Sequence, residues 1–149
     1  MTTQLHERSM HIDAPVETVF DYLKDPHHFF DAFPERDREH MAIAEVNLTP
    51  EGVGSTFRVM GRMFFLFHME YTATRVEYVP NERIVDAVSV GGVWTYTFRP
   101  DETGTTLSMA FGWTERWPTA AAELMDRVSW DGDHDLDLML INIKKAIET

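Results

Sequence analysis

Apolar positions along the chain follow a helical spacing near the N-terminus, alternate in the middle and return to a helical spacing near the C-terminus. Residues 5–12 predict a first strand. Val16, Val19, Phe20 and Leu23 then recur at intervals of three, one and three, which predicts a helix with one apolar face. The chain is therefore expected to open with a strand followed by a helix.

Capping residues set the expected limits of this helix and of a second short one. Asp13 is expected to be the N-cap and Pro15 lies in the first turn, where proline is tolerated. Pro26 ends the first helix, and residues 27–33 predict a short second helix that ends before Pro34.

The middle of the chain, from about residue 42 to 115, predicts strands separated by turn signals. A long helical region follows at about 119–148. Together with the first strand, these elements predict one α+β domain over 1–149, a seven-stranded antiparallel sheet wrapped around the C-terminal helix. The six later strands are expected at 42–48, 55–61, 65–79, 83–90, 93–99 and 106–115.

Alternation within two of these strands predicts which side chains face the interior. In residues 93–99 the large side chains share one face, and threonines occupy the other. The same separation holds in residues 106–115, where Glu115 ends the apolar face. The expected inward-facing residues are Trp94, Tyr96, Phe98, Leu107, Met109, Phe111 and Trp113.

The strand at 65–79 is harder to orient, because both of its faces begin with apolar residues. If Val76 points inward, His68 and Glu70 do so as well, whereas a bulge would reverse the assignment. An apolar outer row would then indicate a dimer interface or a covering helix. This outer row consists of Phe65, Phe67, Met69 and Tyr71.

A narrow apolar stripe marks the expected inner face of the final helix. Leu136, Leu140, Ile143 and Ile147 form it, and its backward extension passes Gly132, Ser129 and Met125. Small residues at mid-helix leave room for a ligand, or for an aromatic side chain such as Trp94 or Trp113. Asp133 lies beside the stripe, at the edge of the interior.

Four aspartates alternate at 131, 133, 135 and 137, immediately before the most strongly helical sequence. A calcium loop would need glycine at its sixth position and glutamate at its twelfth, where this chain has Leu136 and Asn142. Along a helix the four carboxylates divide between two flanks and cannot close on one ion. We therefore expect an acidic helix without a metal.

Composition narrows the functional classes. The formal net charge is −12, with only three lysines, which disfavours nucleic acids and anionic membranes as partners. The absence of cysteine excludes disulfides and thiolate chemistry. The sequence has no apolar run long enough to span a bilayer, so no stable membrane insertion is expected. It also has no signal-peptide pattern, so a cytoplasmic location is expected.

Five local motifs, in this order, resemble the START-like superfamily, also called Bet v 1-like or SRPBCC, and within it the polyketide cyclase/dehydrase and lipid-transport group. The resemblance covers nearly the whole chain and implies the helix-grip fold, whose sheet and C-terminal helix enclose a cavity for an apolar ligand. The motifs are HIDAPVETVFDYLKDP (11–26), GVGSTFRV (52–59), RVEYVPNERI (75–84), WTYTFRPDETGTTLSM (94–109) and INIKKAIE (141–148).

The leading hypothesis is a protein that binds a lipid, a polyketide or an aromatic metabolite without a cofactor. An alternative is a polyketide cyclase or dehydratase, which needs proton transfer in an apolar cavity, where a carboxyl group has a raised pKa. A protein-interaction module is the third reading.

Candidate catalytic residues are Glu115, Glu70 and His68, with Asp133 as a further carboxylate and Tyr96 as an oxyanion donor. Candidate ligand-binding residues are Trp94, Phe98, Met109, Phe111, Trp113, Ser129, Gly132, Asp133, Leu136 and Leu140.

Overall fold

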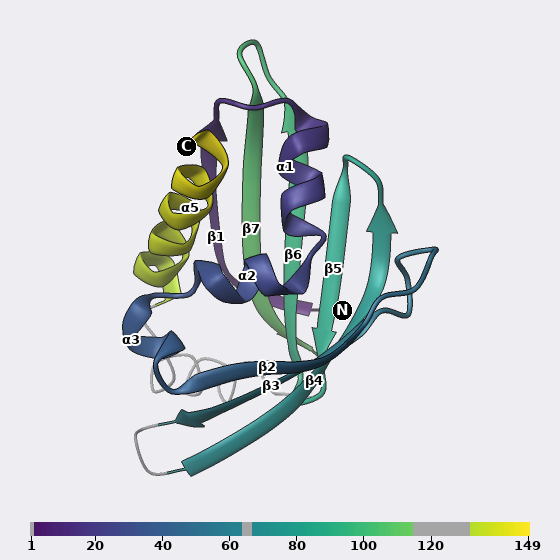
Figure 1. Ribbon diagram of the computed structural model, residues 1–149, viewed down its shortest axis with the longest axis vertical. Coiled ribbons are helices and arrows are strands. Elements are labelled where there is room, and N and C mark those ends of the chain that lie inside the picture. The colour runs from purple at the N-terminus through teal and green to yellow at the C-terminus, as the bar shows by residue number, and fades with distance from the viewer. Residues whose placement is uncertain (1, 64–66, 115–131) are drawn as a thin grey trace.

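A computed structural model describes residues 2–63, 67–114 and 132–149, and Figure 1 shows a strongly curved sheet with helices against one face. The seven strands are antiparallel in the order β1-β7-β6-β5-β4-β3-β2. The predicted helix-grip fold is confirmed. The strands are β1 (Thr2–Ile12), β2 (Met41–Asn47), β3 (Thr56–Met63), β4 (Phe67–Val79), β5 (Arg83–Val88), β6 (Gly92–Pro100) and β7 (Thr105–Thr114).

Three helices connect β1 to β2: α1 (Val16–Leu23), α2 (Pro26–Ala32) and the single turn α3 (Glu35–Arg38). The expected N-cap at Asp13 is wrong, because α1 is preceded by Pro15 and has no side-chain cap. Asp13 is engaged elsewhere: its backbone N–H donates to Glu148 and its carboxylate bonds to His11.

Helix α2 begins at Pro26, a residue that was predicted only to end α1. Asp25 is its N-cap and accepts a hydrogen bond from the backbone N–H of His27, while Pro26 occupies the first position. Phe29 and Ala32 are buried on its inner side. Pro26 therefore both follows α1 and starts α2.

Helix α5 (Gly132–Glu148) runs beside the edge strand β1 (Figure 1). Its acidic first half pairs with that strand: Asp133 bonds to Nδ1 of His6 at 2.9 Å, and Asp137 accepts two bonds from the Arg8 guanidinium at 2.9 and 3.0 Å. Residues four apart on the helix thus meet residues two apart on the strand. Asp133 and Asp137 therefore serve the contact between α5 and β1.

Lys144 near the far end of α5 donates a hydrogen bond to the backbone carbonyl of His11, and the His11 side chain reaches the β6–β7 turn. Its Nδ1 lies 2.7 Å from Asp101 and its Nε2 lies 2.7 Å from Asp13, and these carboxylates raise the pKa of His11 above its ordinary 6.5. His11 in turn holds the pKa of Asp101 below its ordinary 3.8.

The stability contributed by His11 should therefore depend on pH. A raised histidine pKa stabilises the fold fully below about pH 6.5, and this contribution is lost as pH rises through the folded-state pKa. The lowered Asp101 pKa contributes above about pH 4 and is lost as pH falls through its folded value. The melting temperature of wild type should exceed that of His11→Gln most at about pH 5.5, and the difference should shrink toward about pH 8. An equal difference at every pH would contradict this.

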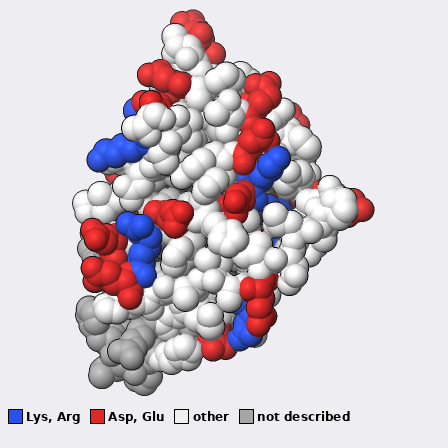
Figure 2. Space-filling model, in the orientation of Figure 1, with Lys and Arg blue, Asp and Glu red and all other residues white. Residues whose placement is uncertain are grey.

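None of the described helices is long and apolar enough to cross a bilayer. The face drawn in Figure 2 carries many more carboxylate than lysine or arginine side chains, in keeping with the net charge of −12. The hydrophobic core lies between the concave sheet face and α1, α2 and α5.

Candidate functional site

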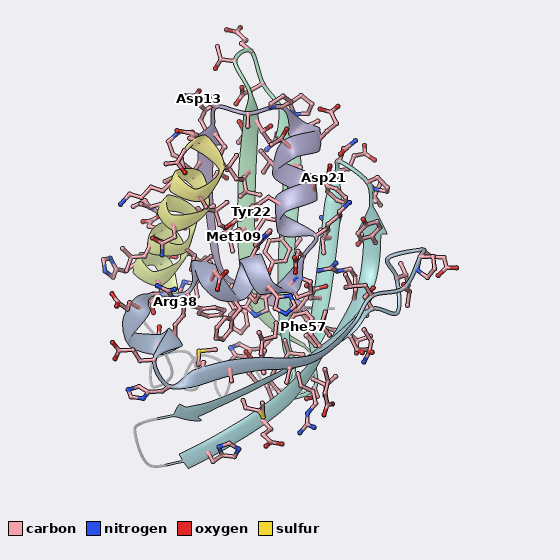
Figure 3. All side chains as sticks on the ribbon, in the orientation of Figure 1. Asp13, Asp21, Tyr22, Arg38, Phe57 and Met109 are labelled. Atoms are coloured by element: carbon pink, nitrogen blue, oxygen red, sulfur yellow. The ribbon has the colours of Figure 1, made fainter. Side chains whose placement is uncertain are left out.

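The inner face of β6 and β7 is a continuous aromatic and apolar surface. The seven side chains predicted to face inward in these two strands are all buried, with Met109 and Leu107 at 0% exposure. Met109 lies on the sheet between α1 and α5 (Figure 3). Alternation therefore oriented these strands correctly.

Helix α2 and the residue that follows it cover this surface with two phenylalanine rings. Phe29 lies edge-on to Trp94, with ring centroids 5.1 Å apart, and Phe33 lies edge-on to the same indole at 6.0 Å. On the sheet, Phe111 lies between Trp94 at 4.8 Å and Trp113 at 5.2 Å. We call Phe29, Phe33, Trp94, Phe111 and Trp113 the aromatic cluster.

Tyr96 brings a polar atom into this apolar region. Its side chain is 2% exposed, its ring lies 5.6 Å from that of Phe29, and its hydroxyl has no hydrogen-bond partner among the described residues. Burial raises the pKa of Tyr96 well above its ordinary 10.0, and the nearby Asp86 carboxylate adds to the rise. The hydroxyl therefore stays protonated and can donate a hydrogen bond.

A buried ion pair lies at the same side of the interior. Arg75 on β4 donates from Nε and Nη2 to the carboxylate of Asp86 on β5, at 2.9 and 3.3 Å, and both side chains are at most 4% exposed. Nη1 of Arg75 also donates to the Lys24 carbonyl at the end of α1. The pair holds the α1–α2 corner against the sheet.

Sequence reasoning did not identify this pair. An aspartate flanked by apolar residues in "IVDAV" was the available signal for Asp86. The Arg75–Asp86 pairing depends on the β4–β5 register, which shifts between Arg75 and Glu77. A shift of this kind is a bulge, and periodicity alone does not locate it.

His68 and Glu70 lie on the outer face of β4, and the premise that Val76 points inward is wrong. Val76 is 52% exposed, and the register shift beside it puts Arg75, Ala73 and Tyr71 on the inner side. His68 and Glu70 are exposed and bond to each other at 3.0 Å.

Glu70 takes part in a surface charge network that also includes Arg58. The His68 hydrogen bond and then the Arg58 charge hold the pKa of Glu70 below its ordinary value. That network stabilises an ionised carboxylate on the surface and supplies no acid or base to the interior.

The apolar outer row expected on β4 is only partly described. Tyr71 packs against the core and is half-buried, and burial raises its pKa to about 12. It therefore does not belong to an outer row. Phe65 and the side chains of Phe67 and Met69 lie outside the described residues.

Helix α5 presents the predicted stripe to the interior, with Leu136, Leu140 and Ile143 at 0% exposure. The buried face is wider than predicted, because it extends to Asp135 and Met139 rather than to Asp133. Asp133 is exposed and pairs with His6, whereas Asp135 is 1% exposed. The prediction that Asp133 borders the interior is therefore wrong, and Asp135 takes that place.

The notch at Gly132 is filled by His6. A Cβ placed on Gly132 would lie 2.1–2.4 Å from three atoms of the His6 ring. The space that the sequence assigned to a ligand, or to Trp94 or Trp113, is thus occupied by a histidine from the edge strand.

Alanine at Gly132 should therefore be coupled to His6. In wild type the new methyl group forces the imidazole off Asp133, which offsets the gain that alanine gives a helix. In a His6→Ala background that gain should reappear, with a coupling free energy of about 1 kcal/mol between the two positions. Urea unfolding of the four proteins in this cycle measures it, and additive effects would contradict the packing described.

Two other candidates, Glu115 and Ser129, lie outside the described residues. Within the described ranges no group of three or more histidine or acidic side chains is placed to hold a metal ion.

A surface depression of about 380 Å³ lies on the sheet over β4, β5 and β6. Four of its seven lining residues are charged, and the Arg83–Glu77 ion pair at 3.0 Å borders it. A charged, open surface does not suit an apolar ligand, so the aromatic cluster is the better candidate.

Comparisons with known proteins agree with this architecture. The family model "Polyketide cyclase / dehydrase and lipid transport" matches residues 4–145. No curated protein is detectably similar in sequence.

Solved structures with the same fold are similar over almost their full length. A protein from Chromobacterium violaceum is 20% identical, with 97% of each chain covered and a TM-score of 0.64. A protein from Rhodobacter sphaeroides is 18% identical, with 98% of this chain and 92% of its own covered, at a TM-score of 0.70.

An AHSA1-like protein from Aeromonas hydrophila is 16% identical, with 99% and 92% covered, at a TM-score of 0.60. Identities at this level establish the fold alone, whereas the family model covers nearly all of the chain. The chain therefore belongs to the polyketide cyclase/dehydrase and lipid-transport family of the START-like superfamily.

Proposed function

We propose that this protein binds a hydrophobic small molecule, such as a lipid, a polyketide or an aromatic metabolite, against the aromatic cluster. The observation that carries the proposal is the inner wall of Trp94, Phe111 and Trp113, covered by rings of α2. Burial of apolar ligand surface there gains about 25 cal/mol per Å², so few polar contacts are required.

The border of the cluster indicates where such a molecule enters. Phe33, Met41, Ile43 and Tyr71 pack on the core and remain partly exposed. They come from the end of α2 and from the inner sides of β2 and β4. We therefore propose that a ligand enters between α2 and the strands β2, β3 and β4, over these partly exposed apolar side chains.

The first test is to extract the purified protein with organic solvent and identify any released molecule by mass spectrometry. A stoichiometric lipid or aromatic metabolite supports the proposal. A protein without such a molecule should instead bind the neutral fluorescent probe N-phenyl-1-naphthylamine with saturation. Absence of both would contradict the proposal.

A pair of truncations should localise that binding. Phe33→Ala removes a ring at the border of the cluster and should weaken probe affinity about five- to tenfold, because about 1–1.5 kcal/mol of apolar contact is lost. Val76→Ala removes an exposed apolar side chain from the outer face and should leave affinity unchanged. Equal effects of the two variants would place the probe elsewhere.

Cyclisation or dehydration of a polyketide is a second candidate, favoured by the buried Tyr96 hydroxyl. That hydroxyl could stabilise an enolate oxygen. With His68 and Glu70 on the outer face and Asp133 exposed on α5, Glu115 is the remaining acid–base candidate named by the sequence. Glu115→Gln should abolish turnover and leave binding of the apolar probe intact; turnover retained in this variant would exclude Glu115 as the acid or base.

A further inference from the structure

The Tyr96 hydroxyl is a buried donor that the described part of the protein does not use. Leaving a buried polar group without a hydrogen bond costs about 1–3 kcal/mol, so such groups usually have a structural or functional reason. The ring of Tyr96 contacts Phe29, a member of the aromatic cluster. The hydroxyl is therefore available to donate a hydrogen bond to a molecule bound against that cluster.

The charges near Tyr96 restrict what it can bind. The Arg75 guanidinium is already neutralised by Asp86 through two hydrogen bonds, and a third bond goes to the Lys24 carbonyl. The pair has no net charge to compensate an anion. A ligand carboxylate would also lose its hydration and lie near the buried Asp86, and an uncompensated buried charge is strongly unfavourable.

We propose that the ligand presents an uncharged oxygen acceptor, a carbonyl or a hydroxyl, to the Tyr96 hydroxyl, and that a carboxylate at this place is rejected. This rests on the proposed function and narrows its ligand class to neutral ketones, esters, alcohols and phenols. Free fatty acids bound with their carboxylate at Tyr96 are excluded by it.

Three probes of similar size test the inference: 2-acetylnaphthalene, 2-ethylnaphthalene and 2-naphthoate. Their dissociation constants are measured at neutral pH for wild type and for Tyr96→Phe, which keeps the ring and removes the hydroxyl. For the ketone, Tyr96→Phe should weaken binding about five- to tenfold, the effect of one hydrogen bond. For the hydrocarbon the two proteins should bind alike, and the carboxylate should bind weakest to both.

The outcomes separate this inference from the proposed function. If 2-ethylnaphthalene binds but Tyr96→Phe does not change the dissociation constant of the ketone, the inference is overturned and apolar binding stands. Naphthoate binding as tightly as the ketone would overturn it too. If 2-ethylnaphthalene does not bind to wild type at all, the proposed function and the inference both fail.

A measurement on the wild-type protein tests the inference even if the variant does not fold. The carbonyl ¹³C resonance of labelled 2-acetylnaphthalene should move downfield on binding, relative to its position in a hydrocarbon solvent, because the oxygen accepts a hydrogen bond. A bound resonance at the hydrocarbon position would overturn the inference without any variant.

Discussion

Replacing Asp86 by alanine should lower the free energy of unfolding by about 3–5 kcal/mol. The substitution leaves the Arg75 guanidinium buried without its counter-ion, and that cost exceeds the value of the lost hydrogen bonds. Arg75 also holds the Lys24 carbonyl, so the α1–α2 corner should loosen as well. Urea unfolding followed by circular dichroism measures the change.

Two control variants separate the cost of an unpaired buried charge from the value of an ion pair. Replacing both partners with apolar residues, Arg75→Met with Asp86→Leu, should cost much less than Asp86→Ala, because no uncompensated charge remains. Glu77→Ala breaks the exposed Arg83–Glu77 pair and should cost about 0–1 kcal/mol. Similar losses for Asp86→Ala and Glu77→Ala would show that Arg75 and Asp86 are not buried as described.

Leu140→Ala should lower the free energy of unfolding by about 2–5 kcal/mol. Leu140 is 0% exposed at the centre of the α5 stripe, so truncation removes apolar contacts and leaves a cavity in the core. Thermal or urea unfolding of the variant provides the measurement.

The adjacent residue is the matched control for the phase of α5. Ile141 is 37% exposed on the same helix, and Ile141→Ala should change stability by less than about 1 kcal/mol, since alanine also favours the helix. A larger loss for Ile141 than for Leu140 would mean that α5 presents a different face to the sheet.

Strand alternation in β6 and β7 was sufficient to predict the inner wall. Each of these strands has large side chains on one face and small polar ones on the other, so the register of the pattern is unambiguous. Their burial confirms Trp94, Phe98, Met109, Phe111 and Trp113 as interior residues. Whether they contact a ligand stays a prediction.

Strand β4 could not be oriented from its sequence, because a register shift reverses its two faces. Before the shift, Ala73 and Arg75 face inward, and beyond it Tyr78 packs against Phe20 of α1. A charged residue such as Arg75 also looks like a solvent-facing position until its partner on β5 is known. Glu70 and His68 were misplaced for the same reason.

The start of α5 shows a second limit of helical periodicity. The stripe through Leu136 and Leu140 correctly predicts the centre of the buried face, but not the side on which it widens. That side is decided by tertiary contacts, since His6 and Arg8 on β1 bind Asp133 and Asp137 and hold them at the surface. His6 filling the notch at Gly132 depends on the same contact between distant segments.

The proposed function requires an apolar molecule to bind inside the fold, on the aromatic cluster. Intermolecular nuclear Overhauser effects between 2-ethylnaphthalene and the labelled protein test it most directly. We expect contacts from the probe to the rings of Trp94, Phe111 and Phe33, and none to the exposed Leu48, Val53 and Val76. Contacts confined to those exposed residues, or no saturable binding, would contradict it.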